Sequence, residues 1–275
     1  MTSSVFYTHS ELGVEGARHL NPDGSVGGFV AATAKVAATA YVSYDAQVLD
    51  NARVLDNAQV LDVAQVTDAA MVCHDAWIAG AAQVSGAAVV HDNAGVYGEA
   101  RVCDDAVVGG DARVSGNAQV YVEGRAEGRA RVSGNARVLG RARVCDDAQV
   151  LGNAFVSGSS RLSGAALLHE DAQVRGDALV YGNARVLGRA QVYEDAQVSG
   201  NARVLGHAKV SGNVSVCDDA QVSGNVSVCD NARVLGRAQV FGNAFVFNDA
   251  WVCGSARVSG HARVSSRVEG ASRVR

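Results

Sequence analysis

The chain carries an apolar residue at every sixth position from Val30 to Val264. Valine fills this position throughout, apart from four replacements at Ile78, Ala126, Leu162 and Leu168. A small residue, nearly always alanine, stands two places earlier. Side chains two residues apart point to the same side of an extended strand. Each hexad therefore predicts a short strand with an inward Ala/Val face, and with Arg, Gln, Leu or Cys pointing outward beside it.

The residues between these strands have the chemistry of turns. The unit Asn-Ala-Arg-Val-Leu-Gly runs from Asn135 to Gly140 and recurs from Asn183 to Gly188. Glycine adopts a positive φ without steric cost, and Asn and Asp tolerate it better than most residues. A helix is excluded, because a six-residue period matches no 3.6-residue stripe and the recurrent glycines would weaken it.

Strands this short cannot bury a face alone, but stacked copies can, which predicts a solenoid. The order Val, any residue, Gly or Asp, Asn or Asp, Ala, any residue resembles the hexapeptide signature of the left-handed parallel β-helix superfamily. The chain is most similar to uncharacterised bacterial and phage hexapeptide-repeat proteins that are often labelled acyltransferases. The resemblance covers residues 28 to 266. It implies three hexads per coil, a triangular cross-section and left-handed winding.

We therefore predict an all-β, single-domain left-handed parallel β-helix, a triangular solenoid whose 40 hexads make about 13 coils. Residues three hexads apart in the sequence become vertical neighbours in such a fold. Residues 1–28 do not repeat and are expected to form an N-terminal cap over the open edge. Residues 29–266 are expected to form the β-helix, and residues 267–275 a short basic C-terminal tail.

Charge and hydropathy narrow the classes of partner. Among the 275 residues, 24 Lys and Arg against 28 Asp and Glu give a formal charge of −4, whereas a nucleic-acid-binding surface would be strongly basic. The chain start has neither the basic nor the apolar region of a signal peptide, and no apolar run approaches the roughly 18 residues of a membrane span. We therefore expect neither nucleic acid nor membrane as a partner.

The cysteines indicate a reducing environment. Each directly follows an inward valine and is therefore expected to point outward, and no two are separated by the three hexads that would stack them. We predict free thiols, which suits a cytoplasmic protein. The six positions are Cys73, Cys103, Cys145, Cys217, Cys229 and Cys253.

Many relatives of this fold are acyl-CoA-dependent transferases. The resemblance implies, for those enzymes, a catalytic histidine at a subunit interface and a long loop that encloses substrate. The unbroken register here leaves no room for such a loop, and the histidines of the repeat region stand in no active-site motif. They are His74, His91, His169, His207 and His261. We assign no catalytic residue and expect no cofactor.

One group of polar side chains suggests chemistry. Cys73 and His91 are three hexads apart and should stack, and His74 should lie between Asp56 and Asp92. A thiol, imidazoles and carboxylates at one corner offer the ligands that a zinc-like ion uses, or groups for acid–base chemistry. Cys73, His74, His91 and Asp92 are therefore metal-ligand candidates. The alternative is a solvated turn in which histidine replaces Gly or Asp.

Two outward apolar patches indicate an interface. Met71, Val89 and Val107 follow one another at steps of three hexads, in a place where Arg or Gln is usual. Near the end of the chain, aromatic residues gather in outward positions of one coil: Phe241, Phe245, Phe247 and Trp251. Exposed apolar groups of this size usually mark a contact surface. The alternative is scattered surface hydrophobes on a regular scaffold.

These observations favour a non-catalytic structural or protein-interaction solenoid that self-associates as a homo-oligomer or binds another protein. The alternative is a hexapeptide-repeat acyltransferase whose acyl-CoA site forms between subunits. An ice-binding face would need regular threonine rows, and no threonine follows Thr67.

Overall fold

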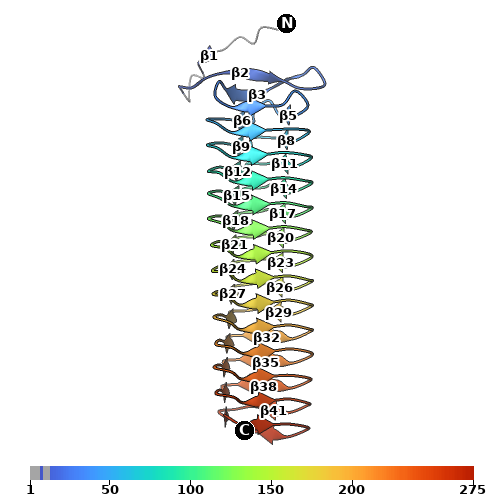
Figure 1. Ribbon diagram of the computed structural model, residues 1–275, viewed down its shortest axis with the longest axis vertical. Coiled ribbons are helices and arrows are strands. Elements are labelled where there is room, and N and C mark those ends of the chain that lie inside the picture. Colours follow the sequence, from blue (N-terminus) through green and yellow to red (C-terminus); the bar gives the residue numbers. More distant parts are fainter. Residues whose placement is uncertain (1–6, 9–12) are drawn as a thin grey trace. The chain divides into compact units, whose positions relative to one another are not determined.

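The computed structural model describes residues 7–8 and 13–275. It divides into two compact units, residues 1–134 (unit 1) and residues 135–275 (unit 2), where the sequence suggested one domain. In a solenoid each turn contacts only its neighbours, so a division between turns needs no change in the sequence pattern. Each unit is built from β-strands that stack in three sheets, as β6, β9, β12, β15 and β18 do in unit 1 (Figure 1).

The strands of unit 1 follow the hexads. The first sheet contains β1 (Tyr7–Thr8), β2 (Glu15–Leu20), β3 (Val26–Ala31), β6 (Gln47–Val48), β9 (Gln65–Val66), β12 (Gln83–Val84), β15 (Arg101–Val102) and β18 (Gln119–Val120). The second contains β4 (Lys35–Val36), β7 (Arg53–Val54), β10 (Met71–Val72), β13 (Val89–Val90), β16 (Val107–Val108) and β19 (Arg125–Ala126). The third contains β5 (Tyr41–Val42), β8 (Gln59–Val60), β11 (Trp77–Ile78), β14 (Gly95–Val96), β17 (Arg113–Val114) and β20 (Arg131–Val132).

Unit 2 repeats the arrangement. Its first sheet contains β21 (Arg137–Val138), β24 (Phe155–Val156), β27 (Gln173–Val174), β30 (Gln191–Val192), β33 (Lys209–Val210), β36 (Ser227–Val228), β39 (Phe245–Val246) and β42 (Arg263–Val264). Its second contains β22 (Arg143–Val144), β25 (Arg161–Leu162), β28 (Leu179–Val180), β31 (Gln197–Val198), β34 (Ser215–Val216), β37 (Arg233–Val234), β40 (Trp251–Val252) and β43 (Arg267–Val268). Its third contains β23 (Gln149–Val150), β26 (Leu167–Leu168), β29 (Arg185–Val186), β32 (Arg203–Gly206), β35 (Gln221–Gly224), β38 (Gln239–Gly242), β41 (Arg257–Val258) and β44 (Arg273–Val274).

The predicted all-β parallel β-helix is confirmed. Strands pair in parallel with partners three hexads further along the chain, as Met71 does with Val89, and the described residues contain no helix. The Ala/Val face is the core, because Val132, Val138 and nearly every other repeat valine are fully buried. In the region that the structure describes, no helix is long and apolar enough to cross a membrane.

The turns are stabilised by hydrogen bonds as well as by residues that tolerate a positive φ. Asp56 adopts φ 55° and Gly98 adopts φ 75° at equivalent positions. The aspartates at these positions also accept a hydrogen bond from the main chain of the next turn, as Asp146 Oδ2 does from Gly164 N–H at 2.9 Å. Neighbouring asparagines form a second ladder, in which Asn135 Nδ2 donates to Asn153 Oδ1 at 2.9 Å. These bonds tie successive turns together at their corners.

An antiparallel hairpin covers one end of unit 1. Strand β2 pairs with β3, and side chains from this hairpin reach the neighbouring sheet. The Asn21 carboxamide, which is buried, accepts a hydrogen bond from Val42 N–H at 2.9 Å and donates to Val42 O at 3.2 Å. His19 Nε2 lies 3.0 Å from Ala40 O. Asn21 thus takes the place of a further strand beside β5.

The C-terminal residues do not form the predicted tail. Strand β43 pairs with β40, and β44 pairs with β41, with Trp251 opposite Arg267 and Arg257 opposite Arg273. These partners are separated by two residues fewer than the three hexads that separate partners elsewhere. The segment from Val264 to Val268 is two residues shorter than a hexad, which shifts the phase of the repeat, and the six-residue spacing then resumes. The solenoid therefore has about 14 turns instead of the predicted 13.

Candidate functional site

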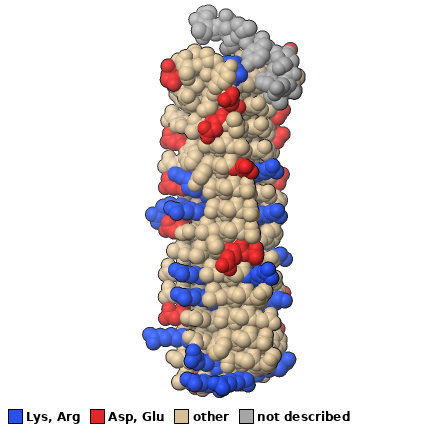
Figure 2. Space-filling model, turned by 180° about the vertical axis from the view of Figure 1, so that it is seen from behind, with Lys and Arg blue, Asp and Glu red and all other residues tan. Residues whose placement is uncertain are grey.

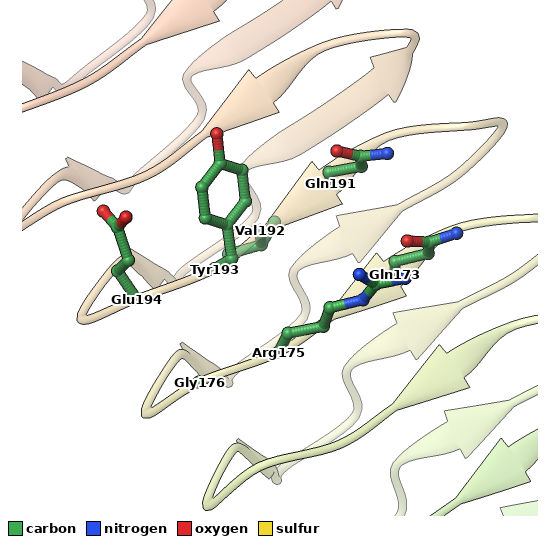
Figure 3. A pocket seen from close by; sticks show the side chains of 7 residues that line it. All are labelled: Gln173, Arg175, Gly176, Gln191, Val192, Tyr193 and Glu194. Carbon is green, nitrogen blue, oxygen red and sulfur yellow. The ribbon is translucent and has the colours of Figure 1, made fainter.

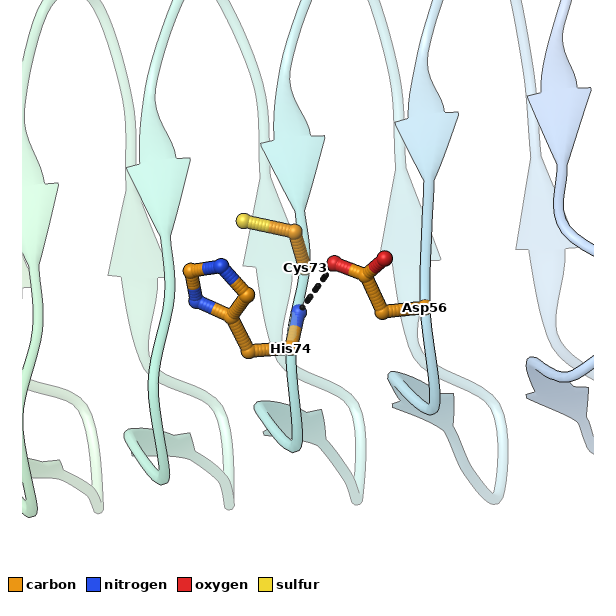
Figure 4. Close-up of side chains that lie close together, drawn as sticks. All are labelled: Asp56, Cys73 and His74. Atoms are coloured by element: carbon orange, nitrogen blue, oxygen red, sulfur yellow. Dashed lines mark hydrogen bonds between the residues drawn. The ribbon is translucent and has the colours of Figure 1, made fainter.

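The predicted corner of unit 1 brings its polar side chains together around His74. Asp56 Oδ2 accepts a hydrogen bond from His74 N–H at 3.0 Å, which Figure 4 shows. On the other side, His74 Nδ1 lies 3.3 Å from Asp92 Oδ1 and 3.2 Å from Asp92 N. His74 therefore lies between the two aspartates, as the three-hexad spacing predicts.

His91 completes the corner in a way that the sequence did not predict. Its Nδ1 lies 3.0 Å from Asp92 Oδ2, and its ring lies over Gly109, where an added Cβ would come within 2.4 Å of His91 Cε1. The ring therefore extends toward the following turn and not back toward Cys73. The missed signal is Gly109 itself, because most turns have a larger residue at this place.

Cys73 follows the inward Val72, which predicts an outward side chain, but it is only 8% exposed. Burial raises the pKa of its thiol, and the carboxylates of Asp56 and Asp92 raise it further. The buried thiol of Cys73 is therefore a poorer ligand than the imidazoles of His74, which is exposed, and His91, which is half-buried.

The carboxylate of Asp92 is the electrostatic centre of the corner. Its Oδ2 accepts a hydrogen bond from Gly110 N–H at 3.1 Å. This bond lowers the pKa of the Asp92 carboxyl, and His91 and His74 lower it further. Asp92 thus presents a fixed anion to two imidazole rings. The ligating atoms of His74, His91 and Asp92 all lie within 4.8 Å of one another, as do those of Asp56, Cys73 and His74.

The two predicted apolar patches differ in character. Met71, Val89 and Val107 stack on β10, β13 and β16 in direct register and are half-buried. They form a continuous apolar row on one sheet of unit 1. Whether this row is an interface stays a prediction.

The aromatic cluster of unit 2 is covered in part by arginines. Phe245 and Phe247 stack with ring centroids 4.7 Å apart, and the Arg263 guanidinium lies 5.1 Å from the Phe245 ring. The Arg267 guanidinium lies 4.7 Å from the Trp251 ring. Phe241 and Trp251 are the most exposed of the four aromatic residues, at 37% and 36%. The cluster combines apolar faces with positive charge, which the residue types alone did not indicate.

A shallow hollow on unit 2 was not predicted. It lies between β27 and β30, where Tyr193 stands above the Arg175 side chain (Figure 3). Its volume is about 350 Å³. The lining residues are Gln173, Arg175, Gly176, Gln191, Val192, Tyr193 and Glu194. The hollow offers amide and charged groups for binding, from residues that look like ordinary repeat positions in the sequence.

All six cysteines are unpaired in the structure, and Cys229 allows a test by pH. Burial, together with a hydrogen bond from its thiol to Asp230, raises the pKa of Cys229 to about 11. Only the thiolate reacts with an alkylating agent. At about pH 8.5 the thiolate fraction of Cys229 is roughly a hundredfold smaller than that of a free cysteine, which slows the reaction by the same factor. A thiolate of higher pKa is more nucleophilic, and this offsets about tenfold of the loss. We expect Cys229 to react roughly tenfold more slowly than the same cysteine in a free peptide.

The pH profile of this reaction provides the check. Because the pKa is raised, the alkylation rate of Cys229 should keep increasing up to about pH 11, whereas the peptide should level off near pH 8.5. Peptide mass spectrometry after timed alkylation measures both rates. A plateau at the same pH for protein and peptide would contradict the assigned environment.

Comparisons with known proteins give few matches in sequence. The YdcK β-solenoid repeat model matches residues 130–146, 196–212 and 238–254. No curated protein matches the chain.

Solved structures of low similarity include two acyltransferases. The chain shares 15% identity with the UDP-N-acetylglucosamine acyltransferase of Francisella novicida, at a TM-score of 0.44, over 58% of this chain. The chain covers 63% of that enzyme, which is less than two thirds of its length. With the UDP-N-acetylglucosamine acyltransferase from Campylobacter jejuni it shares 15% identity at a TM-score of 0.32, over 63% of this chain and 68% of that one.

Proposed function

We propose that this protein is a non-catalytic interaction solenoid that self-associates through the C-terminal end of unit 2. The observation that carries the proposal is the aromatic cluster on the last strands of unit 2, where Phe241 and Trp251 are exposed. Strands β42, β43 and β44 are the last of their sheets, and nothing in the described part of the chain pairs with their outer edges. Such an edge presents main-chain N–H and C=O groups to another chain.

The aromatic cluster adds apolar area beside this edge. Phe245 lies on β39, directly paired with Arg263 of the edge strand β42, and Trp251 of β40 is directly paired with Arg267 of β43. We call the edge strands β42–β44 together with Phe241, Phe245, Phe247 and Trp251 the C-terminal surface. Aromatic and arginine side chains are the types enriched in protein–protein interfaces.

Charge indicates what this surface binds. Residues 257–275 contain five arginines and one glutamate, a formal charge of +4, and residues 1–134 contain 8 Lys and Arg against 16 Asp and Glu, a formal charge of −8. On the face in Figure 2, Lys and Arg side chains gather over the C-terminal strands. Two C-terminal surfaces facing each other would repel. The surface therefore suits the acidic unit 1 of a second copy, in a heterologous contact.

Removing the apolar part of the C-terminal surface tests the proposal. We expect the double substitution Phe245→Ser and Phe247→Ser to convert the assembly to monomer without unfolding it, because neither ring belongs to the Ala/Val core. Light scattering at tens of micromolar protein, a range typical of weak interfaces, measures the mass. Circular dichroism confirms that the variant remains folded.

The matched control is Phe155→Ser. Phe155 also stands outward on a strand of unit 2, with Arg175 over its ring, but outside the C-terminal surface. This variant should keep the mass of the unmodified protein. The assembly should also weaken as salt screens opposite charges. A monomeric unmodified protein, or association that strengthens with salt, would refute the proposed contact.

Acyl transfer stays the competing prediction. A saturable rise in melting temperature with acyl-CoA would favour it, because a ligand that binds only the native state stabilises that state.

A further inference from the structure

Three side chains at the corner of unit 1 converge as ligands of a metal ion would. His74 Nδ1 lies 3.3 Å from Asp92 Oδ1, and His91 Nδ1 lies 3.0 Å from Asp92 Oδ2. Zinc binds imidazole nitrogen and carboxylate oxygen at about 2.0–2.2 Å in tetrahedral geometry, which places neighbouring ligand atoms about 3.3–3.5 Å apart. Each nitrogen lies near this separation from one of the two Asp92 oxygens, and the ligand atoms of the three residues all lie within 4.8 Å of one another.

We propose that His74, His91 and Asp92 bind one Zn²⁺ ion, with the fourth position open to water or to a ligand from a partner. Three protein ligands leave the fourth position of a tetrahedral zinc ion open, whereas structural zinc sites are closed by four protein ligands. The site is distinct from the C-terminal surface and does not depend on self-association.

The position of His74 is compatible with a shared cation. Its Nδ1 lies 3.3 Å from Asp92 Oδ1 and 3.2 Å from Asp92 N. Because this nitrogen has a single lone pair, an ion bound between Nδ1 and the carboxylate would replace the contact of Nδ1 with Asp92 N–H.

Surrounding groups hold two of the ligands in place. Gly110 N–H donates to Asp92 Oδ2 at 3.1 Å, and Gly109 leaves the space that the His91 ring occupies. Such outer contacts orient metal ligands and set their affinity. The other triad, Asp56, Cys73 and His74, suits an ion less well, because Cys73 is only 8% exposed.

Zinc titration of tag-free, chelator-treated protein tests the site. We expect one Zn²⁺ per chain in competition with a colorimetric chelator. The variants His74→Asn, His91→Ser and Asp92→Asn place residues that the repeat already uses at these turn positions, so the backbone should be preserved. Each should weaken zinc binding by more than about tenfold, since removing a ligand costs at least as much as removing an outer contact.

Two further variants distinguish a specific zinc site from non-specific binding by surface histidines. Gly109→Ala leaves all three ligands but displaces the His91 ring, and should weaken zinc binding about 10- to 100-fold. His207→Asn removes an exposed turn histidine elsewhere and should change nothing.

Cobalt gives an independent spectroscopic signature. Bound Co²⁺ should show the visible absorption of a tetrahedral nitrogen and oxygen site without a thiolate charge-transfer band, and alkylation of the cysteines should leave it unchanged. The proposal is wrong if the unmodified protein binds no stoichiometric zinc. It is equally wrong if the His74 and His91 variants bind like the unmodified protein, or if alkylation abolishes binding.

Discussion

Replacing Val186 with aspartate should destabilise the turns around it by more than about 4 kcal/mol, because a buried, unpaired carboxylate belongs to the most damaging class of substitution. Val186 is fully buried on β29. Its neighbours in the sheet are Leu168 and Val204, which belong to the same core. A charge at this position would find neither water nor an oppositely charged partner inside the stack.

The effect should be local, because each turn of a solenoid contacts only its neighbours. Hydrogen exchange measured by mass spectrometry should show loss of protection in the strands nearest β29, while the turns of unit 1 stay protected. The control is Arg185→Gln on the same strand. Arg185 is exposed, and Gln173 and Gln191 hold equivalent positions, so this change should remain within about 0.5 kcal/mol. Equal loss of protection in both variants would contradict the inward and outward assignment.

Repetition explains why the fold could be predicted so fully. A valine at every sixth position with alanine two places earlier leaves one extended arrangement in which all these side chains share a face. The prediction ended too early at Val264, because it followed a fixed phase. Arg267-Val268 and Arg273-Val274 repeat the strand pattern after a shift of two residues, which a search for spacing alone does not find.

The candidate site was predictable in position but not in detail. The three-hexad spacing correctly placed His74 between Asp56 and Asp92. It could not give the direction of the His91 side chain, which depends on the empty space above Gly109. The burial of Cys73 was missed for a similar reason, since strand alternation fixes the side of the sheet and not what neighbouring turns place over it.

The N-terminal hairpin lies before the repeat except for the end of β3, which contains the first repeat valine, Val30, so the pairing of β2 had no periodic signal. Only the need to cover an open edge was foreseeable. How Asn21 meets that need depends on one carboxamide that pairs with both main-chain groups of Val42. This contact leads to the second large expected effect.

Asn21→Leu should destabilise the end of unit 1 by about 2–5 kcal/mol, because it leaves the buried N–H and C=O of Val42 without partners, at roughly 1–3 kcal/mol for each group. Asn21 is 4% exposed, so water does not readily replace its carboxamide. The main-chain bonds of this turn, from Asn21 N–H to Ser25 O and from Gly24 N–H to Asn21 O, do not involve the side chain. The loss should therefore appear first as faster hydrogen exchange of the Val42 amide, and then as proteolytic cleavage within residues 13–31.

Asn21→Asp separates the two halves of the contact. A carboxylate still accepts from Val42 N–H, but it cannot donate to Val42 O and would face that oxygen as a buried anion. The protonated form can donate, so burial should raise the carboxyl pKa in the folded state. For a group with a raised pKa, the stabilising form predominates at low pH and is lost as pH increases through the folded-state value. The difference in stability between Asn21→Asp and Asn21→Leu should therefore favour Asn21→Asp more strongly below about pH 4 than at pH 7.

The matched control is Asn51→Asp. Asn51 is exposed, and Asp75 already stands at the same place in the repeat. This substitution should change the free energy of unfolding by less than about 0.5 kcal/mol at neutral pH. If Asn21→Asp and Asn51→Asp show the same stability at pH 7, the Asn21 carboxamide does not cap β5.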